Sequence, residues 1–123
     1  MHIGLLEDDI SIQEMLLLVL QDEGHLVTNY PDAERCIEAL TRVGVPQPVD
    51  LMIIDWRLNG LMTGTEVIQH MRNTPHLDNL PIILTTAATF SDTKTLHNLH
   101  ISLLEKPFAV DDMLALIKQL THT

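Results

Sequence analysis

The run Leu51-Met52-Ile53-Ile54-Asp55 carries the most information about the fold. Apolar residues that follow one another without alternation are typical of a strand buried on both faces, and this run stops abruptly at a carboxylate. Comparable short apolar runs occupy residues 2–6, 25–29, 82–85 and 101–104. Buried strands of this kind predict a parallel sheet that is covered by helices on each side.

Segments with helical periodicity separate the apolar runs. We expect helices over residues 11–23, from Pro31-Asp32 onwards, and over residues 64–72, 90–99 and 110–120. In the second helix, Ala33, Cys36 and Leu40 fall on one apolar stripe. The alternation of strand and helix along 123 residues predicts a doubly wound α/β fold in a single domain, residues 1–123.

Composition restricts the partners. The net charge of −10 argues against binding nucleic acid, whose backbone requires a basic face. The longest unbroken apolar run, residues 15–20, is far shorter than the roughly 20 residues that span a bilayer, so no membrane partner is expected. The single cysteine, Cys36, cannot form an internal disulfide and is expected to be a buried hydrophobe. No leader peptide is recognised, and a cytoplasmic location is expected.

Polar side chains follow several of the predicted strands. Asp8 and Asp9 come after the first strand, Asp55 after the third, Thr86 after the fourth and Lys106 after the fifth. In an open parallel sheet the carboxyl ends of the strands form the binding edge, so we expect these residues to meet there. Clustered carboxylates repel one another unless a cation neutralises them, and oxygen ligands favour Mg²⁺. A carboxylate nucleophile beside a hydroxyl and an ammonium group is suited to phosphoryl transfer onto a side chain.

Four motifs in order resemble those of the receiver domain of two-component response regulators. They are Leu5-Leu6-Glu7-Asp8-Asp9, Ile53-Ile54-Asp55-Trp56-Arg57-Leu58, Pro81-Ile82-Ile83-Leu84-Thr85-Thr86-Ala87 and Glu105-Lys106-Pro107-Phe108. The resemblance spans essentially the whole chain. It implies a flavodoxin-like (βα)₅ fold and a signalling switch rather than an enzyme, with at most slow self-dephosphorylation.

The resemblance also implies a role for each matching residue. Asp55 would take a phosphoryl group from a phosphohistidine on a sensor histidine kinase or phosphotransfer protein. Asp9 would bind Mg²⁺ directly and Asp8 through metal-bound water, with the backbone carbonyl of Arg57 as a further ligand. Thr86 and Lys106 would contact the phosphoryl group, and the Lys106–Pro107 peptide bond would be cis. An output partner or fused output domain is implied but not identified.

Two departures from the family pattern stand out. The position three residues before Lys106, where the family has Tyr or Phe, holds Leu103, which presents neither a ring nor a hydroxyl. The loop after Asp55, residues 59–64, is one residue longer than usual and lacks the family's proline. We therefore expect the phosphorylation chemistry to survive and the readout by a switching aromatic ring to be altered.

Other functions stay open beside this one. A degenerate receiver that serves as a phosphorylation-independent interaction module is favoured by Leu103 and the altered loop. A phosphatase of haloacid dehalogenase type also uses an aspartyl nucleophile, but it usually has a second Asp two residues later, where this chain has Arg57. A flavodoxin is disfavoured because no Ser/Thr-rich loop follows the first strand. Taken alone, the Asp8-Asp9 pair is more typical of a helix cap or a solvated loop.

Overall fold

The sheet is built from five parallel strands in the order β2-β1-β3-β4-β5. The computed structural model describes residues 1–42, 49–58, 62–87 and 100–121. Its elements are β1 (His2–Leu6), α1 (Ile10–Asp22), β2 (Leu26–Asn29), α2 (Ala33–Thr41), β3 (Leu51–Asp55), α3 (Gly64–Arg72), the 3₁₀ turn η1 (Pro75–Leu77), β4 (Ile82–Thr86), β5 (Ser102–Glu105) and α5 (Val110–Thr121). The predicted doubly wound α/β fold is confirmed. The helix predicted over residues 90–99 lies outside the described residues.

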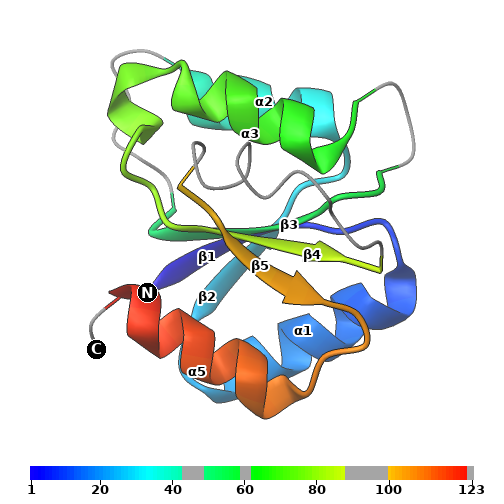
Figure 1. The fold of residues 1–123 in the computed structure, drawn as a ribbon. Coiled ribbons are helices and arrows are strands. Elements are labelled where there is room, and N and C mark those ends of the chain that lie inside the picture. The colour runs from blue at the N-terminus through cyan, green and yellow to red at the C-terminus, as the bar shows by residue number, and fades with distance from the viewer. Residues whose placement is uncertain (43–48, 59–61, 88–99, 122–123) are drawn as a thin grey trace.

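Among the described residues, helices cover both faces of the sheet (Figure 1). The helices α1 and α5 lie on one face, and α2 and α3 lie on the other. The central strand β3 is buried along its whole length and supplies both cores in alternation. Leu51 and Ile53 pack toward α1 and α5, whereas Met52 and Ile54 pack toward α2 and α3. The unalternated apolar run therefore reflects burial on both faces, as predicted.

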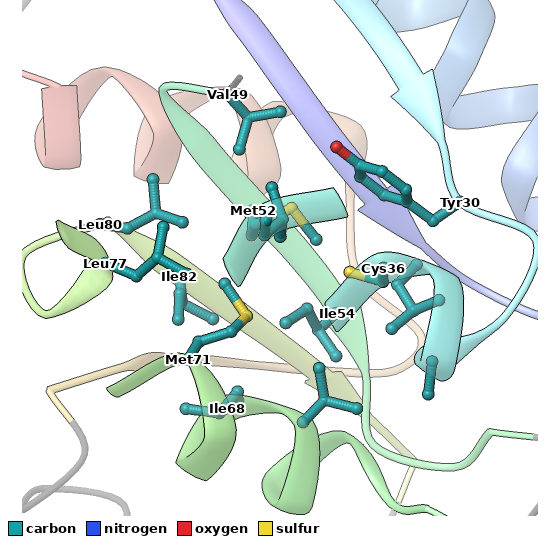
Figure 2. Packing of buried hydrophobic residues seen from close by; sticks show 14 of the residues in the cluster. Tyr30, Cys36, Val49, Met52, Ile54, Ile68, Met71, Leu77, Leu80 and Ile82 are labelled. Carbon is teal, nitrogen blue, oxygen red and sulfur yellow. The ribbon is translucent and has the colours of Figure 1, made fainter. Parts of the chain in front are cut away.

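The core beneath α2 and α3 shows how the predicted helical stripes are used (Figure 2). Cys36 of α2 and Ile68 and Met71 of α3 point toward Met52 and Ile54 of β3. Cys36 is fully buried, and this burial raises the pKa of its thiol to about 12. The thiol stays protonated at neutral pH, so the prediction of a buried hydrophobe is confirmed.

Polar caps fix where the helices begin. The Asp9 side chain accepts a hydrogen bond from the Ile12 backbone N–H, and the Asp32 side chain accepts one from that of Arg35. The Asp9 cap places the start of α1 at Ile10, one residue earlier than the helix predicted over residues 11–23. The connection between α3 and β4 contains the short turn η1.

The ends of β3, β4 and β5 are aligned by the sheet register. Asp55 pairs with Thr85, and Thr86 pairs with Glu105, so the polar residues at these strand ends lie side by side. Met1 and the last turn of α5 lie at the opposite end of the sheet (Figure 1). Among the described residues, no helix has the length and apolar character needed to cross a membrane.

The buried hydroxyl of Thr85 offers a test of the packing. Thr85 is 1% exposed, and its Oγ1 has no hydrogen-bond partner within the described part of the chain. Because an unsatisfied buried hydroxyl is costly, Thr85→Val is expected to raise the free energy of unfolding by about 1 kcal/mol in urea denaturation. Thr41→Val is the matched control, since its hydroxyl donates to the Ile37 carbonyl and its loss should not stabilise the fold. A destabilised Thr85→Val protein would show that this hydroxyl has a partner.

Candidate functional site

A cleft of about 430 Å³ opens at the carboxyl ends of the strands. It contains every residue that the sequence predicted for the site. The lining residues are Glu7, Asp8, Asp9, Asp55, Trp56, Arg57, Thr86, Ala87 and Lys106. Residues separated by up to about a hundred positions thus meet because β1, β3, β4 and β5 are neighbours in the sheet.

Asp55 and Lys106 form the centre of the cleft. Asp55 is the last residue of β3 and is 7% exposed. The Lys106 Nζ lies 3.3 Å from the Asp55 Oδ1, close enough for an ion pair. The Lys106 backbone N–H donates to the Thr86 carbonyl at 2.7 Å, which joins the ends of β4 and β5. The Lys106–Pro107 peptide bond is cis, as the resemblance implied.

Glu7 is the site residue that sequence reasoning missed. It directly follows β1 and is only 2% exposed. Lys106 Nζ lies 3.2 Å from its Oε1 and 3.4 Å from its Oε2, and the Asp9 backbone N–H donates to Oε1 at 3.2 Å. Burial, and then the nearby charge of Asp55, raise the pKa of the Glu7 carboxyl, while Lys106 opposes the shift. The available signal was the run of three acids, of which the first lies closest to the strand end.

The two other acids of this run differ in surroundings. Asp9 is exposed, and its Oδ1 accepts from the Ile12 backbone N–H at 3.2 Å. Asp9 therefore caps α1 while lining the cleft, and its direct role toward a metal stays a prediction. Asp8 is half-buried and lines the same cleft.

The backbone after Asp55 is held in place by β4 and by the start of α3. The Trp56 N–H donates to the Thr85 carbonyl, and the Gly64 N–H donates to the Trp56 carbonyl, each at 2.8 Å. A capping box between Thr63 and Glu66 begins α3 at this point. Trp56 is half-buried and is the only tryptophan of the chain, which makes it a natural reporter of the cleft.

The donor set of the cleft fits a hard cation. Glu7 and Asp55 are two buried carboxylates that share one ammonium group, so their negative charge is only partly balanced. Within the described ranges, no three His, Cys, Asp or Glu side chains are grouped closely enough to enclose a metal ion. Mg²⁺ needs no such enclosure, because it usually keeps several waters and takes one or two carboxylates from the protein.

Leu103 lies on β5, three residues before Lys106. It pairs with Leu84 across β4 and β5 and is half-buried against the core beneath α2 and α3. The departure from the family pattern therefore concerns a side chain that packs beside the site, whereas the residues that line the cleft match the pattern.

Residues 3–118 match the family model described as response regulator receiver domain. The chain belongs to this family, whose members are regulatory phosphoacceptor modules of two-component signalling and not catalytic enzymes.

Similar proteins agree with this assignment. The phosphate regulon transcriptional regulatory protein PhoB of Escherichia coli (strain K12) is 28% identical over 119 residues, which are 95% of this chain and 50% of that protein. The uncharacterized transcriptional regulatory protein YkoG of Bacillus subtilis (strain 168) is 32% identical over 120 residues, 95% of this chain and 49% of that protein. The chain thus spans about half the length of these regulators.

Solved structures share the fold. The chemotaxis protein CheY4 of Vibrio cholerae has a TM-score of 0.82 at 24% identity, covering 97% of each chain. The receiver domain of the sensor histidine kinase PA1611 of Pseudomonas aeruginosa PAO1 has a TM-score of 0.83 at 24% identity, covering 99% of this chain and 98% of that one. In the latter structure a magnesium ion is coordinated in the active-site cleft of that protein.

Gly64 tests how closely α3 must approach the acceptor strand. A Cβ at this position would lie 2.9 Å from the Trp56 Cα and nearer still to the Asp55 carbonyl oxygen, and neither atom can move without the backbone. Gly64→Ala is expected to destabilise the fold by about 2 kcal/mol and to shift the Trp56 emission maximum. Gly4→Ala is the control for the spectrum, because its Cβ would meet the buried side chains of Met52, Tyr30 and Val49 and not the backbone of Asp55 and Trp56. An unchanged Trp56 spectrum in Gly64→Ala would contradict the tight contact.

Proposed function

We propose that Asp55 is the phosphoacceptor of a signalling switch. A phosphohistidine on a sensor histidine kinase or a phosphotransfer protein is the donor, and the phosphorylated domain favours a conformation with a different affinity for an output partner. One observation carries the proposal: the Asp55 carboxylate lines an open cleft, 3.3 Å from the Lys106 ammonium group. A cytoplasmic setting follows from this function, and residues 1–123 act as one receiver unit.

The chemistry needs few groups. An Asp55 carboxylate oxygen attacks phosphorus, the phosphorus–nitrogen bond of the phosphohistidine breaks, and the leaving imidazole takes up a proton. Lys106 offers a positive charge to the phosphoryl oxygens, and the Thr86 hydroxyl offers a donor. Both side chains come from the strand ends beside Asp55, so they need only small movements to reach the new group.

Mg²⁺ is the proposed cofactor. When bound, it neutralises the carboxylates and the phosphoryl oxygens of the transferred group. Asp8, Asp55 and the backbone carbonyl of Arg57 are suited to hold it, with Glu7 close by, and Asp9 lines the same cleft. The magnesium ion in the PA1611 receiver domain, a protein of the same fold, supports this assignment.

Leu103 favours a second candidate, a receiver that acts by protein interaction without phosphorylation. A leucine on β5 offers no ring that changes its exposure together with Thr86. The complete set of Asp55, Thr86 and Lys106 around one cleft favours the phosphoacceptor.

Phosphorylation is tested by intact mass after incubation with acetyl phosphate and Mg²⁺. The expected result is one adduct of about 80 Da, the mass of a phosphoryl group. The adduct should be absent in Asp55→Asn and in the presence of EDTA. Asp50→Asn makes the same change just ahead of the amino end of β3 and should label like the native chain. No adduct in a native chain that binds Mg²⁺ would favour the interaction module.

The acidic loop is tested by titrating Mg²⁺ against Trp56 fluorescence. Asp8→Asn is expected to weaken Mg²⁺ binding about tenfold or more, because it removes a charge from the cleft. Asp9→Asn is expected to weaken binding less than Asp8→Asn does, because the charge of the exposed Asp9 is better screened by solvent and its carboxylate faces the Ile12 backbone N–H, which asparagine still caps. The opposite ranking would support the direct role toward Mg²⁺ that the family resemblance implies for Asp9.

A further inference from the structure

Gln13 connects α1 to the loop that carries the acids. Its side chain folds back from the first turn of α1, and its Nε2 donates a hydrogen bond to the Glu7 carbonyl oxygen. Its own backbone N–H donates to the Asp9 carbonyl at 2.9 Å. One residue therefore holds both ends of the three-residue loop from Glu7 to Asp9.

The Glu7 carbonyl needs such a partner. It lies just beyond the paired part of β1, whose last register partners are Asn29 for Leu5 and Ile54 for Leu6. Glu7 is almost completely shielded from solvent, so water offers its backbone little compensation. The side-chain amide of Gln13 supplies to the Glu7 carbonyl the hydrogen-bond donor that a neighbouring strand would otherwise supply.

Three hydrogen bonds close the loop on itself. They are Gln13 Nε2 to the Glu7 carbonyl, the Asp9 N–H to the Glu7 carboxylate, and the Ile12 N–H to the Asp9 carboxylate. Among these three donors, only that of Gln13 belongs to a side chain. It is therefore the donor that evolution or mutagenesis can remove without changing the charge of the cleft.

We propose that Gln13 is a positioning residue that holds Glu7 and Asp8 in place for the metal. The proposal rests on the proposed function, because it assumes that these acids serve Mg²⁺. Lys106 also holds the Glu7 carboxylate, but Asp55 competes for the same ammonium group. A phosphoryl group on Asp55 would draw Lys106 further away, and the loop would then depend on its own hydrogen bonds. Gln13 has no contact with substrate in this role and acts through the loop.

The experiment compares the native chain with Gln13→Met and with Gln21→Met. The second variant is the matched control, because Gln21 is exposed near the far end of the same helix. Mg²⁺ alone is titrated against Trp56 fluorescence. Gln13→Met is expected to bind Mg²⁺ about tenfold more weakly, as is typical when an outer-shell hydrogen bond is lost, whereas Gln21→Met should match the native chain. Gln13→Asn keeps a polar side chain, but its shorter amide does not reach the Glu7 carbonyl, so it should bind Mg²⁺ as weakly as Gln13→Met. It therefore separates loss of the hydrogen bond from any misfolding that the apolar methionine causes.

A second readout separates positioning from stability and needs no metal. In hydrogen exchange of the metal-free protein, the amides of Asp8 and Asp9 should exchange faster in Gln13→Met, while those of α5 keep the native rate. If Gln13→Met binds Mg²⁺ with the affinity of the native chain but melts at a lower temperature, the proposal is overturned and Gln13 has a merely structural role. Loss of the fold in both Gln13 variants would overturn it in the same way. A native chain that binds no Mg²⁺ would overturn the proposed metal site, while loop exchange would still decide whether Gln13 holds the loop.

Discussion

Two buried carboxylates share one ammonium group at the carboxyl end of the sheet, and the rest of the structure serves this arrangement. Lys106 lies within ion-pair distance of Glu7 and Asp55. Like charges at this depth are costly to ionise together unless a cation compensates them. A lysine alone leaves negative charge in the cleft, and that residual charge is what a divalent cation would neutralise. These electrostatics support the proposed binding of Mg²⁺ in the cleft and the proposed phosphorylation of Asp55.

The parallel sheet is what makes such a cluster possible. Glu7 and Lys106 directly follow β1 and β5, Asp55 is the last residue of β3, and the strand order brings these three strand ends to one edge. Two of these ends are fixed by separate backbone contacts: Gly64 lies against the Asp55–Trp56 backbone, and the Lys106 N–H donates to the Thr86 carbonyl. The apolar cores on both faces hold the strands in register, so the charged groups need not stabilise the fold that positions them.

Much of this was predictable because the pattern is strong where burial is complete. The run from Leu51 to Asp55 identified a strand buried on both faces, and the polar residues after the strands identified the edge that carries the site. The choice among neighbouring acids was not predictable. It depends on where β1 stops and on whether a carboxylate turns into the cleft or back onto a helix, as Asp9 does when it caps α1. The return of the Gln13 side chain to Glu7 is equally invisible in the sequence, because it depends on the three-dimensional path of the loop.

Leu103, the departure from the family pattern on β5, lies outside the set of residues that line the cleft. The cleft needs charges and a hydroxyl at fixed places, and this chain keeps them. The side chain of Leu103 packs against the apolar core beneath α2 and α3 instead. Thr86 and Lys106 are already joined by a backbone hydrogen bond of 2.7 Å between β4 and β5. If Thr86 moves toward a phosphoryl group, this bond would carry the movement to β5 whatever the side chain at 103 is. A leucine at position 103 would respond to this movement of β5 by a change of packing, whereas an aromatic side chain would respond by turning its ring inward.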